Sequence, residues 1–418
     1  MDRKHIAAWA LYDFAGSIYS AVIATAVFSV YFVNVIVGNE SGVRGDVVWG
    51  WVGSLSVAIV AFSSPLLGSI ADRSGVRKPL FVLYTLVGVG AVAAFTLLDP
   101  GMVWVAFTLA VVANVAFEGG LVFYNAWLPN IAPRSHHGRV SGLGYGLGYA
   151  GSAAGLIASI PLAQAGRFDL IWLVVAAWWL LFSLPAFLTL PAAPGLGESV
   201  GQAAVRGLTQ FRRIVGEVLA ERELRRFLLA FFFYIDGVLT VIWFAAIFAN
   251  QTLGFTQSEV IVLFLIVQFS ALAGAFALAR PADTLGPKRV ISGLLVLWTA
   301  VAISVYFVTS KPVFFAIAVI AGTGLGAIQA TSRSFMASLI PDGKEGEMFG
   351  FYAFCGKSSS IIGPLVFGTV SWATGGNQRF AVVAIAAFFI IGGLLLQRVR
   401  DPVVGRAQAQ APSESALT

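Results

Sequence analysis

The stretch Gly68-Ser-Ile-Ala-Asp72-Arg73-Ser-Gly75-Val-Arg77-Lys78 recurs later in the chain as Ala279-Arg-Pro-Ala-Asp283-Thr-Leu-Gly286-Pro-Lys288-Arg289. The aspartate, the glycine that follows it and two basic residues keep their register in both copies. Each copy lies between two long apolar runs. A short polar motif that recurs at the same place between apolar runs indicates two homologous halves, with any binding site between them.

Apolar runs of about 20 residues occur throughout the chain, and this is the length that the hydrocarbon core of a bilayer selects. Of the 418 residues, 58% are apolar and only 11% are charged, which excludes a soluble globular protein and a disordered one. The sequence therefore predicts an all-α integral membrane protein with twelve transmembrane helices in two pseudo-symmetric six-helix bundles. The predicted spans are 8–37, 47–70, 79–98, 102–127, 140–165, 169–190, 227–250, 257–279, 289–309, 312–336, 348–372 and 379–397.

The basic residues predict the orientation of these spans. With a cytoplasmic amino terminus, 20 of the 26 Lys and Arg residues lie in inside segments and four in outside loops, while Arg333 and Lys357 lie within spans. This bias places both termini in the cytoplasm and the chain in the cell (inner) membrane as a multi-pass protein. The net charge of +6 then reflects topology and anionic lipid headgroups, so we expect no nucleic acid partner.

The longest polar interval divides the spans into two sets of six. We expect an N-terminal six-helix bundle at 1–190, a cytoplasmic linker at 191–226, a C-terminal six-helix bundle at 227–397 and a disordered cytoplasmic tail at 398–418. In the linker, apolar residues recur at three- and four-residue spacing, which predicts an amphipathic helix on the cytoplasmic interface. These residues are Val205, Leu208, Phe211, Val215 and Val218. A merely solvated linker is the alternative.

The internal repeat extends beyond the loops. Asp13 in the first span corresponds to Asp236 in the seventh. A proline and three glycines recur 208 residues apart, as Pro133, Gly138, Gly142 and Gly148 in one half and Pro341, Gly346, Gly350 and Gly356 in the other. The glycines of the fifth span are spaced so that helix backbones can approach closely.

The duplicated loop resembles the signature loop of the major facilitator superfamily. Three other segments resemble its vacuole-effluxer branch, which is related to autophagy-associated amino-acid exporters. These are Trp9-Ala-Leu-Tyr12-Asp13-Phe14-Ala15, Tyr124-Asn125-Ala-Trp-Leu-Pro129, and the stretch from Gln329-Ala-Thr-Ser-Arg333 through Phe349-Gly350-Phe-Tyr352 to Gly363-Pro364. The resemblance implies a secondary transporter that works by alternating access on an amino acid or another small polar metabolite. It also implies that spans 1, 4, 7 and 10 line a common cavity.

One feature departs from that resemblance. Similar antiporters carry a Gly-Pro pair in span 5, where this chain reads Gly142-Leu-Gly144-Tyr-Gly146-Leu-Gly148, and the pair Gly363-Pro364 lies in span 11 instead. The direction of transport is therefore left open.

The duplicated loops are candidate gates. Their glycines allow a tight turn, their aspartates can meet the positive amino end of a nearby helix, and their basic residues can pair with carboxylates across the gap. Such contacts would hold one side of a transporter closed, whereas the alternative gives the basic residues a role in topology alone. The candidate gate residues are Gly68, Asp72, Arg73, Gly75, Arg77, Lys78, Asp283, Gly286, Lys288 and Arg289.

Five ionisable residues lie inside the predicted spans and away from their ends, where each needs a partner or a wet cavity. They are Asp13, Glu118, Asp236, Arg333 and Lys357. Polar residues follow them at helical spacing on spans 1, 4 and 7, which indicates polar stripes that face a common centre. The candidate substrate and proton pathway comprises Asp13, Asn114, Glu118, Asn125, Asp236, Trp243, Gln329, Arg333 and Lys357.

The charges within the spans suggest a mechanism. Three acids stand against two bases, and desolvation favours the neutral form of a carboxyl group without a full partner. We therefore expect Glu118, Asp13 or Asp236 to carry a proton, and Lys357 or Arg333 to hold an anionic group of the substrate. In the alternative, Asp13 and Asp236 pair structurally with Lys357 or cap backbone near the cytoplasmic ends, and Arg333 reaches the membrane interface.

Other functions fit the sequence less well. No Cys or His cluster has metal-ligand spacing, so no metal and no cofactor are expected, and the three histidines lie near cytoplasmic ends, which argues against an intramembrane enzyme. A non-transporting receptor or scaffold would explain the spans but not charges directed at one centre. Sugars, drugs or other organic solutes are alternative substrates. The expected partners are a small-molecule substrate, protons and the lipid bilayer, with the chain as a monomer.

Overall fold

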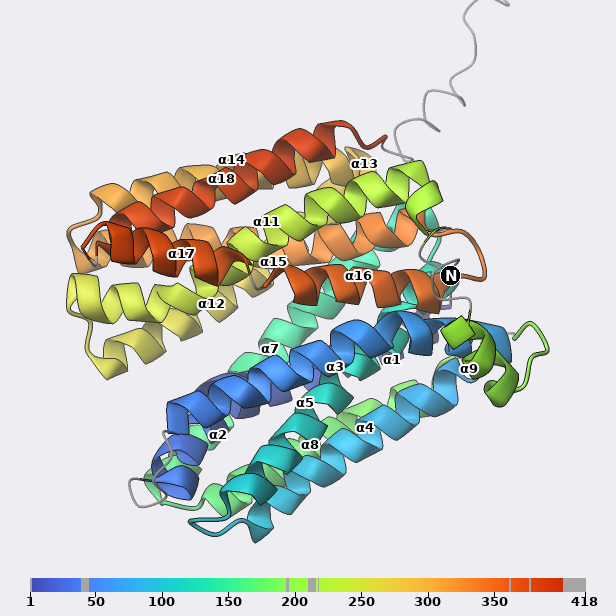
Figure 1. Ribbon diagram of the computed structural model, residues 1–418, viewed down its shortest axis with the longest axis horizontal. Coiled ribbons are helices and arrows are strands. Elements are labelled where there is room, and N and C mark those ends of the chain that lie inside the picture. The colour runs from blue at the N-terminus through green and yellow to red at the C-terminus, as the bar shows by residue number, and fades with distance from the viewer. Residues whose placement is uncertain are drawn as a thin grey trace, which may run out of the picture.

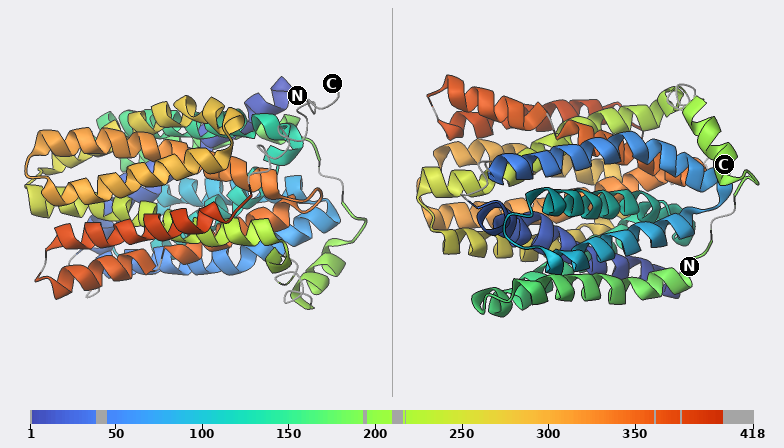
Figure 2. Two further views of the ribbon diagram at one scale, coloured as in Figure 1. Left: turned by 90° about the horizontal axis from the view of Figure 1, so that it is seen from above. Right: turned by 60° about the horizontal axis from the view of Figure 1, so that its bottom comes forward.

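The computed structural model describes residues 2–38, 45–192, 195–209, 216, 218–360, 362–375 and 377–400. Within these residues every regular element is a helix. Figure 1 shows the helices in two groups, with α1–α5 and α8 below, α11–α18 above and α7 reaching between them. The long helices run roughly parallel to one another in the further views as well (Figure 2).

The first bundle contains the predicted spans 1 to 6. Its first span is a series of helical segments, α1 (Arg3–Ile18), η1 (Tyr19–Ala26), α2 (Phe28–Tyr31) and η2 (Phe32–Val37). The others are α3 (Gly45–Ser74), α4 (Arg77–Ala94) with η3 (Phe95–Leu97), α5 (Val103–Asn125), α7 (His137–Gln164) and α8 (Phe168–Thr189). The short helices α6 (Leu128–Ile131) and η4 (Arg134–His136) connect α5 to α7.

The second bundle contains the predicted spans 7 to 12. These are α11 (Arg222–Ile247) with η5 (Phe248–Thr252), α12 (Gln257–Ala277) with α13 (Ala279–Thr284), α14 (Pro287–Phe307), α15 (Lys311–Leu339), α16 (Glu345–Ser359) with α17 (Ile362–Ala373), and α18 (Gln378–Gln397). Each predicted span therefore corresponds to helix at nearly its predicted place.

Ten of these helical stretches are long and apolar enough to cross a membrane. For the other two, α11 and the pair α16 and α17, crossing stays a prediction. The sequence predicts one continuous span at 348–372, whereas α16 ends at Ser359 and α17 begins at Ile362. Pro364 contributes to this break, because it lacks a backbone N–H and its ring collides with the carbonyl of Ser360 in a continuous helix.

The two bundles meet along a few helices, chiefly α3 against α16 and α7 against α12 and α15. Glycines make this contact possible, as the sequence predicts. A Cβ atom on Gly68 would lie 2.1 Å from the carbonyl oxygen of Gly346, and one on Gly142 would lie 2.7 Å from that of Ala275. Any larger side chain at these positions would force the bundles apart.

The close contacts lie toward one end of the molecule, where α3 and α15 end and α4 and α16 begin. We call this the gate end. The helix α9 (Val200–Thr209) of the linker lies at the same end (Figure 1).

The linker is only partly described. Ala203 of α9 is fully buried beside α3, whereas Val205 is 63% exposed, and Val218 is buried. Phe211 and Val215 and the side chain of Leu208 lie outside the described residues, as does the tail from residue 401. The interfacial role of the linker and the disorder of the tail stay predictions.

Candidate functional site

A cavity of about 380 Å³ lies between the two bundles. Side chains from α1, α5 and α7 of the first bundle and from α11, α12, α15 and α16 of the second line it. Six of the predicted pathway residues are among them, namely Asp13, Glu118, Asn125, Gln329, Arg333 and Lys357. The cavity is polar enough and large enough to hold a small solute with water.

An ion pair crosses this cavity from one bundle to the other. The Nζ of Lys357 on α16 lies 2.5 Å from Oε1 of Glu118 on α5. The two side chains are 28% and 23% exposed, so water reaches both. Each has the other as its charged partner, and a solute with complementary charges can therefore compete for either group.

Arg333, by contrast, is only 2% exposed and its polar atoms are all engaged. Its Nε donates to Oγ of Ser141 at 2.9 Å and its Nη2 to the Ser141 carbonyl oxygen at 2.8 Å. Its Nη1 donates to Oδ2 of Asp13 at 3.0 Å, and that oxygen also accepts from the Tyr124 hydroxyl at 2.7 Å. Arg333 therefore ties α15 of the second bundle to α1 and α7 of the first.

Aromatic rings enclose the same guanidinium. Its central carbon lies 4.0 Å from the ring centroid of Tyr145, 4.7 Å from that of Trp9 and 5.7 Å from that of Tyr124. A cation over ring faces in a buried site is stabilised by the ring quadrupoles. The alternative in which Arg333 reaches the membrane interface does not hold, because the structure places the side chain between the bundles.

Two neutral residues of the pathway also join the bundles. Gln329 on α15 accepts a hydrogen bond from the Tyr149 hydroxyl on α7 at 2.5 Å. The Oδ1 of Asn125 on α5 accepts from Nη1 of Arg333 at 3.4 Å. Polar contacts at the cavity wall therefore come from both halves.

Asp236 does not line the cavity, contrary to the sequence expectation. It is fully buried, and its Oδ2 accepts from the backbone N–H of Gly363 at 2.8 Å while Oδ1 accepts from Thr240 at 3.4 Å. On α11 the cavity is lined instead by the apolar residues Phe231, Ile235 and Leu239. One residue is about 100° of helix rotation, so Asp236 faces the start of α17.

A further pathway prediction, the one for Asn114, is not met by this cavity. Asn114 is half-buried on α5 and does not line it. The side chain of Trp243 lies outside the described residues.

The gate loops have the geometry that the sequence predicts. Oδ1 of Asp72 accepts from the backbone N–H of Gly346 at 3.0 Å, and Oδ2 from that of Glu347 at 2.9 Å. In the other half, Oδ1 of Asp283 accepts from the N–H of Gly138 at 2.7 Å. Each aspartate therefore caps the first turn of a helix in the opposite bundle, where the helix dipole favours negative charge.

The conserved spacing of glycine in the two loops serves the turn. Gly75 has a φ of +69° and Gly286 a φ of +90°, a conformation that other residues rarely adopt. The helices α4 and α14 begin directly afterwards. Arg73 reaches the linker, where its Nη1 lies 3.3 Å from Glu198, and Arg289 is exposed.

The basic residues of the loops take a different register from the one read in the sequence. Sequence spacing pairs Arg77 with Lys288. In the structure, however, Lys78 and Lys288 both donate to carbonyls at the end of the last helix of their own bundle or just after it. Lys78 donates to Leu190 at 2.7 Å, and Lys288 to Gln397 at 2.8 Å and Val399 at 2.7 Å. The first loop is one residue longer between its aspartate and its helix, 73–76 against 284–286, so that Arg77 aligns with Pro287 and has no basic counterpart.

Arg77 forms a buried network of ion pairs and hydrogen bonds. Its Nη2 lies 2.8 Å from Asp72 and 3.2 Å from Glu345 of α16, and its Nη1 donates to Asn130 at 2.6 Å. Asn130 in turn donates to Glu345 at 3.1 Å. The gate end is thus closed by charges on both bundles.

The sequence interpretation missed Ser141, Tyr145 and Tyr149 on α7 and Gln268 on α12. The first three recur at four-residue intervals, which was an available signal of one polar helix face. The glycines between them indicate close helix packing, and from the sequence we infer only that role for this helix. Gln268 is a single amide on an otherwise apolar stretch and gave no such signal.

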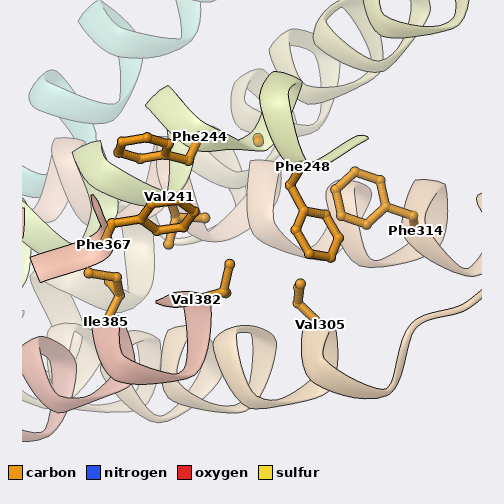
Figure 3. A pocket seen from close by; sticks show the side chains of 9 residues that line it. Val241, Phe244, Phe248, Val305, Phe314, Phe367, Val382 and Ile385 are labelled. Atoms are coloured by element: carbon orange, nitrogen blue, oxygen red, sulfur yellow. The ribbon is translucent and has the colours of Figure 1, made fainter. Parts of the chain in front are cut away.

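A second cavity, of about 40 Å³, lies inside the second bundle (Figure 3). Its lining is entirely apolar and includes Phe244, Phe248, Phe314 and Phe367. A polar solute would lose its hydrogen bonds there, so this cavity is no candidate for its binding.

Comparison with known proteins agrees with this geometry. The family model described as "Vacuole effluxer Atg22 like" matches residues 48–410. The chain is 31% identical over 408 residues to the "Uncharacterized MFS-type transporter YxiO" of Bacillus subtilis (strain 168), with 94% of each chain covered. It is 24% identical to "Autophagy-related protein 22" of Coccidioides immitis (strain RS), with 76% of this chain and 66% of that protein covered.

Among solved structures, the fold is similar to that of the human organic anion transporter MFSD10 (TETRAN). The TM-score is 0.75 at 16% sequence identity, with 94% of this chain and 98% of that chain covered. At this identity the likeness shows the fold alone, which is that of the major facilitator superfamily. The extent of the family match and the identity to the Bacillus protein show more: this chain is a multi-pass membrane transporter, not an enzyme, and it belongs to the Atg22-like vacuole effluxer family of the major facilitator superfamily.

Proposed function

We propose that the protein is a secondary active transporter that moves a small polar metabolite, an amino acid, by proton-coupled alternating access. The observation that carries the proposal is the ion pair of Glu118 and Lys357, which is partly exposed in a cavity between two bundles. A substrate bound there contacts both halves at once. Rocking of the halves about that point would expose it to each side in turn.

The two charges suit a zwitterion. The ammonium of Lys357 can hold a carboxylate, and the carboxylate of Glu118 can hold an amino group. Arg333 is the other cation in the cavity wall, but its donors are already bonded to Ser141 and Asp13. We therefore assign the anionic group of the substrate to Lys357 and give Arg333 the role of a latch between the bundles.

Glu118 is also the carboxyl group best placed to carry the proton. Asp13 is held by Arg333 and Tyr124, and Asp236 is bonded away from the cavity. Protonation of Glu118 would release Lys357 for the substrate, because a neutral carboxyl group no longer holds the ammonium. The proton and the substrate would then bind together.

We place the gate end in the cytoplasm, together with both termini, and the protein in the cell membrane. The loops at that end carry most of the Lys and Arg residues, as the positive-inside rule requires. The contacts that close the gate end then correspond to a state closed toward the cytoplasm.

A flux assay in proteoliposomes tests the proposal. Vesicles that contain the purified protein should take up more labelled amino acid than vesicles without protein. An imposed pH gradient should increase this uptake. Uptake is also measured in the presence of unlabelled sugars and organic anions. Inhibition by one of these solutes and not by amino acids would show that the substrate is not an amino acid. Equal uptake with and without protein for all these solutes would contradict transport itself and favour a receptor or scaffold.

A further inference from the structure

The gate end holds a carboxyl group that the duplicated loops do not account for. Glu347 lies in the first turn of α16 with only 5% of its surface exposed. Its Oε1 has no hydrogen-bond partner among the described residues. At this oxygen the buried carboxylate lacks a hydrogen bond that would stabilise its charge.

Charged and polar groups surround Glu347 on several sides. On its own segment lie Lys344 and Glu345, α3 presents Ser69, Asp72 and Arg73, and α4 presents Arg77. Arg77 is bonded to Asp72 and to Glu345, and Arg73 is paired with Glu198 of the linker. Three buried carboxyl groups thus lie in this region, and the buried guanidinium of Arg77 pairs with those of Asp72 and Glu345. No such pair is formed between Arg77 and Glu347 among the described residues.

The electrostatic balance agrees with this geometry. Burial raises the pKa of the Glu347 carboxyl, and the negative charge of Asp72 raises it as well. Lys344, the side chain of Ser69 and Arg73 lower this pKa without cancelling the effect of burial. Contact between the bundles therefore shifts the protonation equilibrium of this carboxyl group toward the neutral form.

The repeat shows that this acid is particular to one gate. The residue 208 positions earlier is Arg139, which follows Gly138 as Glu347 follows Gly346. Arg139 is 43% exposed, and its Nε lies 3.4 Å from Asp283. Where one gate has a base paired with its aspartate, the other has an acid beside its aspartate.

We propose that Glu347 is a proton-binding site of the gate, which holds a proton while the bundles are in contact and releases it when they separate. Separation of α3 from α16 would open the backbone contact of Gly68 with Gly346 and hydrate the carboxyl group. The inference rests on the alternating access proposed above, and it adds a second protonation site to Glu118.

The direction of the pH effect follows. The closed gate binds one more proton than the open gate at pH values between the two pKa values of Glu347. Lowering the pH through that range shifts the population toward the closed gate, by up to about tenfold per pH unit for a single proton.

Distance measurements on the purified protein test this directly. Spin labels are placed at Ser135 of the first bundle and Thr284 of the second, both exposed at the gate end, in a background with Cys355→Ser. Double electron–electron resonance should show a shorter label-to-label distance for the closed gate and a longer one for the open gate. The fraction of molecules with the longer distance should rise with pH. In Glu347→Gln this fraction should stay low and lose most of its pH dependence, whereas Glu347→Asp should keep a pH dependence.

The matched control is Asp342→Asn, which removes an exposed carboxyl group of the same loop and should behave as the unmodified protein. A Glu347→Gln protein that elutes and melts like the parent but keeps its full pH dependence would overturn the inference. Proteoliposome flux separates the two proposals. Flux that ignores the pH gradient, together with a gate that still responds to pH through Glu347, would refute proton coupling and leave the gate site standing.

Discussion

Glu118 and Lys357 meet across the boundary of the two bundles, with their charged atoms 2.5 Å apart. The first residue lies on α5 and the second on α16, two turns or more from the contacts that close the gate end. Any relative movement of the bundles must change this pair. In the function proposed above, this pair couples solute binding to conformational change.

Exchanging the two charges tests that coupling. Glu118→Gln should uncouple uptake from the pH gradient, and Lys357→Gln should lower uptake about tenfold or more, because each removes one half of the binding site. The exchange Glu118→Lys with Lys357→Glu should restore folding and part of the binding. Flux and substrate-induced thermal stabilisation measure both effects, and a Glu118→Gln protein that keeps its proton dependence would exclude Glu118 as the carrier.

Arg333 should not be replaceable by lysine. Arg333→Lys keeps the charge but loses the planar fork that reaches Asp13 and both oxygens of Ser141. We expect a loss of about 2–4 kcal/mol in stability, because Asp13 is left partly unpaired in a buried site. Thermal unfolding in detergent measures it. An unchanged melting temperature would show that the aromatic rings alone hold the cation.

The two helix-capping aspartates should have similar effects on the gate. Asp72→Asn and Asp283→Asn each remove a charge at a helix amino end, a contribution of about 0.5–2 kcal/mol. The gate end should then open more often, by roughly two- to thirtyfold in population. Opening of the gate end is measured by labelling a cysteine placed at Ser64. This buried residue of α3 lies with its backbone against Gly350 of α16. Unaltered labelling and flux in both variants would leave these loops a role in topology alone.

Asp236 should behave as a structural residue. Asp236→Ala removes the acceptor for the Gly363 N–H at the break between α16 and α17, at a cost of about 1–3 kcal/mol. Asp236→Asn keeps an acceptor there and should retain most of the stability and transport. Melting temperature and flux, measured side by side, distinguish the two. A stable Asp236→Asn protein without transport would return Asp236 to the proton pathway.

The sequence by itself determined the helices, the internal repeat and the two loops whose aspartates contact the opposite bundle. Apolar runs of membrane length and the duplicated loop are local signals, because a bilayer imposes span length and a tight turn imposes glycine at Gly75 and Gly286. The pairing of Asp72 and Asp283 with helix amino ends followed from charge alone. The presence of Glu118 and Lys357 at membrane depth was enough to predict a polar cavity.

Only the tertiary structure decided which polar groups share that cavity and which partner each one takes. Asp13 and Asp236 occupy equivalent places in the repeat, yet one faces Arg333 and the other the start of α17. A rotation of one residue about a helix axis separates these outcomes, and helix packing sets that rotation. Helix packing also decides the partners at the gate end. The contact of α3 with α16 buries Glu347, while the guanidinium of Arg77 pairs with Asp72 and Glu345.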